Sequence, residues 1–137
     1  MSEQTPPPGG ADDAEVLALA AKLFDLARDG DAAGLAAYVD AGAPADLANE
    51  RGDTLLMLAA YHGHADAVRA LIERGADPNR ANDHGQTPLA GAVFKGVTEV
   101  VDALLAGGAD PAAGAPSALE AARMFGRAEL LARFGAA

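Results

Sequence analysis

Apolar side chains recur at helical spacing along most of this chain, and glycines interrupt them at regular intervals. The first run occupies residues 16–27 and ends at Gly30. Its spacing predicts an amphipathic helix, which Asp12 or Asp13 can cap. Residues 1–11 lack apolar side chains that could be buried and are rich in Pro and Gly, so they are expected to form a disordered tail.

The pattern repeats itself with a period of 33 residues. The matching pairs are Gly52 with Gly85, Thr54 with Thr87, Gly63 with Gly96, Gly75 with Gly108, and Asp77 with Asp110. A constant period over many positions is typical of a repeat solenoid, in which each unit buries its apolar face only against its neighbours.

Within each unit the sequence predicts two short antiparallel helices. Threonine can cap the first helix, glycine in left-handed geometry ends it, and a second helix with one apolar face follows. The predicted helices are residues 55–62, 65–74, 88–95 and 98–106. The stretch that joins the units, GADPNRANDHGQ, has the composition of a hairpin loop that projects sideways.

This unit resembles the ankyrin repeat, in the form found in small bacterial proteins. Residues 52–79 read GDTLLMLAAYHGHADAVRALIERGADPN, and residues 85–110 read GQTPLAGAVFKGVTEVVDALLAGGAD. Residues 24–47 resemble a degenerate first repeat and residues 117–134 a shortened last one. The resemblance implies an all-α solenoid of about four helix-turn-helix repeats with projecting hairpin loops. Its domain covers residues 12–135, with units at about 12–48, 49–81, 82–114 and 115–135.

Two departures from the family pattern affect the expected stability. Met57 and Ala90 stand where the family has a histidine, so we expect the usual polar link between first helices to be missing. Gly91 lies inside a predicted helix and costs about 1 kcal/mol relative to Ala, so the third repeat is expected to be locally soft. The end units are expected to carry polar outer faces, supplied in the first helix by charged residues at positions 12, 13, 15, 22 and 25.

Charge and composition exclude several classes of function. The net charge of −10 argues against binding to nucleic acid, which needs clustered Lys and Arg. The absence of cysteine excludes disulfides and thiolate chemistry. No apolar run approaches the length of a transmembrane helix and no signal peptide is recognisable, so we expect a cytoplasmic protein without a membrane role.

The sequence offers no convincing catalytic or metal site. His62 and His64 flank Gly63, and the resemblance implies that His64 stabilises the turn. His62 has no second ligand at metal spacing on its face. Ser117 is expected to cap a helix, and no phosphate-binding loop is present. We therefore expect neither an enzyme nor a cofactor.

The resemblance implies that hairpin tips and first-helix surfaces line a concave binding face. Tyr61, Phe94 and Phe125 are expected to form a line along it, each one repeat apart. Aromatic residues and arginines are frequent binding hot spots. The alternative is that Phe94 and Phe125 fold beneath the second helix as core. The candidate partner-binding residues are Arg28, Asp29, Glu50, Arg51, Asp53, Tyr61, His62, Asp83, His84, Gln86, Phe94, Lys95, Met124 and Phe125.

These observations favour a protein–protein adaptor or inhibitor that grips one partner on its concave face. The alternative function is an acidic decoy or chaperone-like cap for a basic protein. Residues 1–50 suggest it, because they carry ten acidic and two basic side chains, a net charge of −8. We expect a monomer, with dimerisation through an end repeat as a further possibility.

Overall fold

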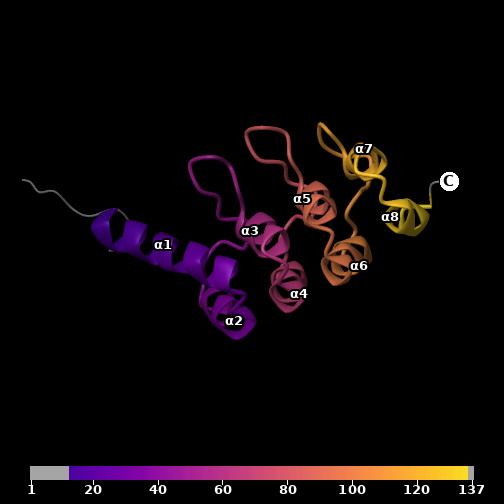
Figure 1. The fold of residues 1–137 in the computed structure, drawn as a ribbon. Helices are drawn as coiled ribbons and strands as arrows, with labels where there is room; N and C mark the ends of the chain where they lie inside the picture. The colour runs from indigo at the N-terminus through magenta and orange to yellow at the C-terminus, as the bar shows by residue number, and fades with distance from the viewer. Residues whose placement is uncertain (1–12, 136–137) are drawn as a thin grey trace, which may run out of the picture.

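The computed structural model describes residues 13–135, which form eight helices in two rows (Figure 1). The predicted tail and Asp12 lie outside the described residues. The first helices of the pairs form one row and the second helices form the other. This is the all-α repeat solenoid that the sequence predicts. The helices are α1 (Asp13–Asp29), α2 (Ala32–Asp40), α3 (Leu55–Tyr61), α4 (Ala65–Glu73), α5 (Pro88–Lys95), α6 (Thr98–Ala106), α7 (Ala118–Met124) and α8 (Ala128–Arg133).

The predicted caps start the inner helices. The hydroxyl of Thr54 accepts a hydrogen bond from the Met57 backbone N–H at 3.1 Å, and Thr87 accepts one from Ala90 at 3.2 Å. Ser117 forms a complete capping box with Glu120. These side chains satisfy N–H groups that have no partner within their helix.

Left-handed glycines end the first helices of the middle repeats, as predicted. Gly63 has a φ of +83° and Gly96 one of +74°, which side chains with a Cβ rarely adopt. Two predicted helix ends were one residue too long, since α3 ends at Tyr61 and α4 at Glu73. His62 and Arg74 fall outside the helices because their ψ angles, 4° and 16°, have already left helical values.

Each helix row packs along its length and the two rows pack against each other. In the inner row α3 contacts α1 and α5, and α5 contacts α7; in the outer row α4 contacts α2 and α6. Small alanines and branched aliphatic side chains fill the space between them, among them fully buried Leu55, Val68, Leu89 and Leu104. The core is therefore a shallow layer extended along the stack, and each unit depends on its neighbours.

Hairpin loops project from the inner row on one side and are joined by polar links (Figure 1). The Asp83 N–H donates to the Arg51 carbonyl at 3.0 Å, and the Ala115 N–H donates to the Gly85 carbonyl at 2.9 Å. Met57 and Ala90 cannot supply the family's histidine link, as expected. Successive loops are connected by these backbone hydrogen bonds.

The expectation of a polar outer face on the first helix was only partly right. Asp13, Glu15, Lys22 and Asp25 are exposed, but so are Val16, Leu17 and Leu19. The reason is length, because α1 has 17 residues and α2 has 9, so the start of α1 extends beyond its partner (Figure 1). Val16 and Leu19 line a second hollow of about 350 Å³, together with Leu23, Tyr38 and Leu47 among others.

Gly91 does not interrupt its helix, since α5 runs continuously from Pro88 to Lys95. The glycine is buried against the neighbouring repeat. A Cβ added there would lie 3.4 Å from the Met57 methyl carbon, an ordinary van der Waals contact. The local softness predicted for this repeat stays a prediction.

Candidate partner-binding site

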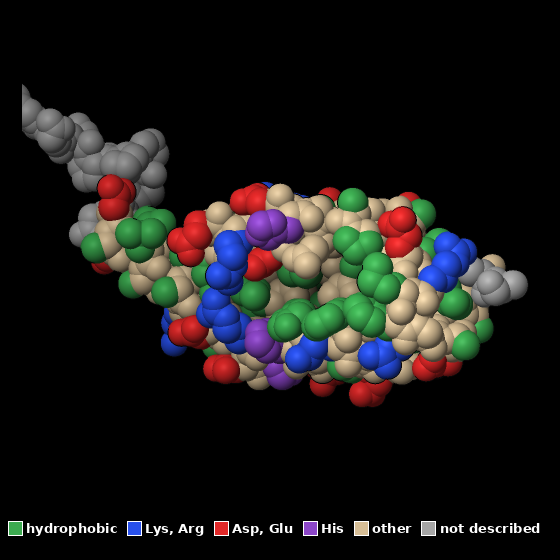
Figure 2. Space-filling view, turned by 45° about the horizontal axis from the view of Figure 1, so that its top comes forward, with side chains coloured by type: hydrophobic (Ala, Val, Ile, Leu, Met, Phe, Trp, Pro, Cys, Tyr) green, Lys and Arg blue, Asp and Glu red, His purple; other side chains and the backbone are tan. Residues whose placement is uncertain are grey.

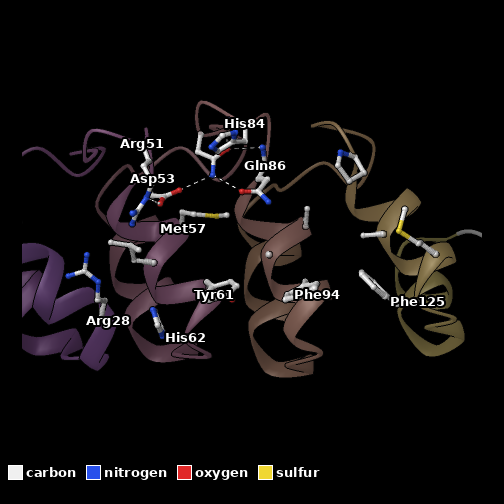
Figure 3. Close-up of a pocket in the computed structure, with 17 residues that line it drawn as sticks. Arg28, Arg51, Asp53, Met57, Tyr61, His62, His84, Gln86, Phe94 and Phe125 are labelled. Carbon is white, nitrogen blue, oxygen red and sulfur yellow. Dashed lines mark hydrogen bonds and ion pairs between the residues drawn. The ribbon is translucent and has the colours of Figure 1, made fainter.

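A concave hollow of about 570 Å³ lies along the inner helices, beneath the hairpin loops (Figures 2 and 3). Helices α3, α5 and α7 supply most of its floor, and the loops before α3 and α5 supply its upper wall. We call this surface the concave hollow. Its lining residues are Arg28, Arg51, Asp53, Met57, Leu58, Tyr61, His62, Asn82, His84, Gln86, Ala90, Gly91, Phe94, Pro116, Ala121, Met124 and Phe125.

Three aromatic side chains follow one another along this hollow. The rings of Tyr61 and Phe94 stack with centroids 6.4 Å apart, and Phe94 meets Phe125 edge-on at 5.5 Å. Their exposed fractions are 36%, 53% and 46%. The alternative that Phe94 and Phe125 fold beneath the second helices is therefore wrong. We call Tyr61, Phe94 and Phe125 the aromatic ladder.

The three aromatic residues do not share one register position, contrary to the prediction. Tyr61 and Phe94 each lie seven residues after their capping threonine, whereas Phe125 lies eight residues after Ser117. Met124 takes the seventh position. Phe125 still reaches Phe94 because it follows the last residue of α7, where the chain leaves the helix.

Cationic and polar groups join the aromatic ladder at its N-terminal end. The ammonium of Lys95 lies 4.9 Å from the centroid of the Tyr61 ring, within range of a cation–π interaction. His62 meets the same ring edge-on at 5.4 Å. Arg28 reaches the hollow from α1 (Figure 3).

A hydrogen-bonded network fixes the upper wall. The Asn82 amide nitrogen donates to an Asp53 carboxylate oxygen and to the Gln86 side-chain oxygen, both at 2.8 Å. The other Asp53 oxygen accepts from Arg51 Nε at 3.3 Å. Asn82 also accepts from the backbone N–H of His84 and of Gln86. The loop conformation, and the placement of Asp53, are therefore set before any partner arrives.

Burial and neighbouring positive charges both act on His62 at this end of the hollow. Partial burial lowers the pKa of its imidazole below the ordinary value of 6.5, and the positive charges of His64, Arg28 and Lys95 lower it further. Each cause disfavours the imidazolium. An anionic group beside His62 would act in the opposite direction.

The structure brings ten of the fourteen candidate residues into the concave hollow. The other four candidates do not line it. Asp29 is the last residue of α1, and Glu50 and Asp83 are exposed on loops. Lys95 lies beside the hollow, over the Tyr61 ring. Seven lining residues were missed. They are Met57, Leu58, Asn82, Ala90, Gly91, Pro116 and Ala121.

Helical spacing could have identified most of the missed residues. Met57 and Leu58 lie three and four residues after the cap Thr54, and Tyr61 follows at seven. These positions share one helix face, and Ala90 and Gly91 repeat them in α5. Within the helices, the prediction considered only the residues just before the turn glycine, and so it missed the previous turn of each helix.

Neither a metal-binding cluster nor a membrane-spanning helix is present among the residues that the structure describes. Residues 13–135 contain no group of three His, Cys, Asp or Glu side chains placed to hold a metal ion. In the same range, no helix is both long and apolar enough to cross a bilayer.

Two rows of short helices with projecting loops define a helical repeat solenoid, and comparison with known proteins identifies its kind. The family model for ankyrin repeats, described as three copies, matches residues 17–114. The chain therefore belongs to the ankyrin repeat family. Ankyrin repeats are generally protein–protein interaction modules and are typically non-enzymatic.

Individual relatives agree with this assignment. The ankyrin repeat protein PA3287 of Pseudomonas aeruginosa is 54% identical over 44 residues, which are 32% of this chain and 26% of that protein. The crystal structure of the human ASB11 ankyrin repeat domain matches with a TM-score of 0.62 and 31% identity, over 65% of this chain and 40% of that one. The matched regions thus span well under half of either relative.

Proposed function

We propose that this chain is an adaptor or inhibitor that holds one partner protein in the concave hollow. The aromatic ladder is the observation that carries the proposal. Large apolar side chains exposed in a continuous line are costly in water unless something covers them, and such patches mark interaction sites. A hollow with a polar wall already fixed by hydrogen bonds also needs little reorganisation on binding.

The distribution of side chains in the hollow matches that of binding hot spots. Aromatic and arginine side chains at the centre of an interface commonly contribute most of its energy. Here Tyr61, Phe94 and Phe125 line the floor, with Arg28 and Arg51 at one end. Lys95, beside the hollow, places its ammonium over the Tyr61 ring at a distance that suits a cation–π interaction.

The acidic decoy is the competing proposal, and it depends on the charge of residues 1–50. The charges that line the concave hollow do not favour it, since two arginines and one carboxylate face the cavity. A decoy would bind through the acidic surface outside the hollow. Its affinity would fall steeply with added salt, whereas binding centred on the aromatic ladder would change little.

Affinity capture from a lysate of the source organism tests the proposed function. The four-residue variant Tyr61→Ala, His62→Ala, Phe94→Ala and Lys95→Ala removes the centre of the hollow. We expect the intact chain to retain one protein in near-stoichiometric amount and this variant to lose it. Circular dichroism and a thermal melt establish that the variant is folded.

A matched control carries four substitutions elsewhere: Val16→Ala, Leu17→Ala, Leu19→Ala and Arg69→Ala. Like the test variant, it removes three large side chains with apolar surface and one cation from exposed positions. We expect it to retain the partner. Retention by the concave variant together with loss by this control would move the binding site to the start of α1 or to Arg69 on α4, and would overturn the proposal.

A further inference from the structure

The concave hollow is electrically polarised along its length. Arg28, Arg51 and His62 line its N-terminal end, and Lys95 lies beside them over Tyr61. The C-terminal end, next to Phe125, is lined by Pro116, Ala121 and Met124, none of which is charged. In Figure 2, Lys, Arg and His side chains gather beside one end of a hydrophobic band, and further basic side chains lie along its lower edge and toward the other end.

The one carboxylate among the described lining residues is already neutralised. Asp53 accepts hydrogen bonds from Arg51 and from Asn82, so it offers no free negative charge to a ligand. Arg51 and Asp53 together contribute a net charge near zero. The excess positive charge at this end therefore comes from Arg28 and Lys95.

Neither of these two cations is firmly committed within the chain. Arg28 pairs with Asp25 three residues earlier at 3.1 Å, and the Asp25 side chain is 72% exposed. An exposed pair of this kind contributes little and is easily exchanged. Within residues 13–135, Lys95 has no carboxylate at ion-pair distance, and its ammonium faces the Tyr61 ring.

We infer that the partner presents an acidic segment with apolar side chains to the concave hollow. Its carboxylates would lie against Arg28 and Lys95, and its apolar side chains would fill the space between Phe94, Met124 and Phe125. This inference rests on the proposed function and gives the partner a chemical class. An acidic segment is the opposite of the basic partner that the net charge of the chain suggests.

Screening by salt explains why the charges near the hollow, and not the net charge of the chain, determine which ligand charge is favoured there. The chain carries a net charge of −10, but at physiological ionic strength charges more than about 8 Å apart are largely screened. A carboxylate inside the hollow therefore responds to the nearby cations more than to distant acidic side chains. The net charge would slow the approach of an acidic partner without preventing short-range pairing.

Selection from a random library of linear peptides displayed on phage tests this inference. The intact chain serves as bait, and Phe94→Ala serves as a parallel bait that lacks the centre of the aromatic ladder. We expect the intact chain to enrich peptides rich in Asp and Glu together with Phe, Leu or Trp, and poor in Lys and Arg. We expect these peptides to be lost from the Phe94→Ala bait.

A charge reversal with a matched control then measures the contribution of Arg28. Arg28→Glu and Arg69→Glu each reverse an arginine that pairs with an aspartate three residues earlier, at 3.1 Å and 3.0 Å respectively. Arg69 lies on α4 in the outer row and does not line the hollow. For a selected synthetic peptide we expect Arg28→Glu to weaken binding roughly tenfold and Arg69→Glu by less than about twofold.

The outcomes separate the inference from the proposed function. Peptides that need Phe94 but are basic or uncharged, or that bind Arg28→Glu as tightly as the intact chain, would overturn the acidic class and leave the concave hollow as the binding site. Peptides held equally by the Phe94→Ala bait would overturn both proposals. A library that yields no enriched peptide would overturn the linear-segment form of the partner.

Discussion

The imidazole Nε2 of His64 lies 2.7 Å from the carbonyl oxygen of Arg28, a residue 36 positions earlier in the chain. This hydrogen bond joins the start of α4 to the last turn of α1, next to the cationic end of the concave hollow. The same imidazole covers the turn at Gly30. His64 thus has the structural role that the family resemblance implied, and it holds the backbone from which the Arg28 side chain extends.

Replacing His64 with alanine should lower the free energy of unfolding by about 1–3 kcal/mol. The substitution leaves the Arg28 carbonyl without its partner and removes the ring that packs on Gly30. Urea denaturation followed by circular dichroism measures the change. His84→Ala is the control, since His84 is exposed on a loop and its loss should alter the stability by less than about 0.5 kcal/mol. Equal effects of the two substitutions would show that the hydrogen bond contributes nothing.

A second pair of substitutions tests the packing of this turn. Gly30 and Gly126 both have positive φ, +78° and +65°, so alanine is strained at either site by about 1–2 kcal/mol. A Cβ at Gly30 would also overlap the His64 ring, whereas one at Gly126 meets nothing within 4 Å. Thermal melts should therefore show a clearly larger loss for Gly30→Ala. If Gly126→Ala costs as much, backbone strain alone accounts for both.

Most of the fold could be predicted from the sequence because local signals repeat in register. Thr54 and Thr87 cap helices, and Gly63 and Gly96 end them, 33 residues apart. Each of these signals depends only on neighbouring residues, and their repetition at a constant period predicts a stack of similar units. The exposed apolar start of α1 was missed because helical spacing shows which residues share a face, but not how far that face extends beyond its partner.

The site was less predictable because it depends on how neighbouring helices are spaced. The line of aromatic residues was expected. The position of Phe125, however, depends on whether α7 ends before or after this residue, a difference of one position that the pattern does not determine. Asn82 was missed because its role arises from contact with Asp53 of the preceding loop. Hydrogen bonds between repeats leave only a weak signal in a single sequence.

The imidazole of His62 should titrate below pH 6.5 in an NMR titration. Its pKa is lowered by burial first, and then by His64, Arg28 and Lys95. Because the folded state binds the proton less tightly than the unfolded state, stability should rise with pH between the lowered pKa and 6.5 and stay constant above it. The effect on stability should be small, since the His62 side chain is only slightly buried and much of it remains in contact with solvent. A pKa at or above 6.5 would contradict the combined effect of burial and the neighbouring positive charges.

The same group should report the charge of the partner. A carboxylate beside His62 would raise its pKa, so affinity for an acidic peptide should increase as the pH falls from about 7.5 through 6.5. Calorimetry at several pH values measures this dependence. His62→Gln should remove most of it while leaving the rest of the hollow intact. Affinity that falls over the same range would indicate a partner that places a cation there.

Phe94→Ala should cost little stability, although Phe94 lies at the centre of the aromatic ladder. Its ring is 53% exposed, so the loss of its two ring contacts should lower the free energy of unfolding by about 1 kcal/mol. Leu89→Ala, in the same helix but fully buried, should cost about 2–5 kcal/mol. Denaturant titrations of both variants test this contrast. Similar costs would mean that Phe94 belongs to the core.

The affinity of the captured partner for Phe94→Ala and for Leu17→Ala tests the central claim most directly. Both substitutions shorten an exposed apolar side chain, but only Phe94 lines the concave hollow. We predict that calorimetry will show Phe94→Ala binding at least about 30-fold more weakly, the loss expected of a hot spot of about 2 kcal/mol, and Leu17→Ala binding within about twofold of the intact chain. Unchanged affinity for Phe94→Ala would contradict binding in the concave hollow.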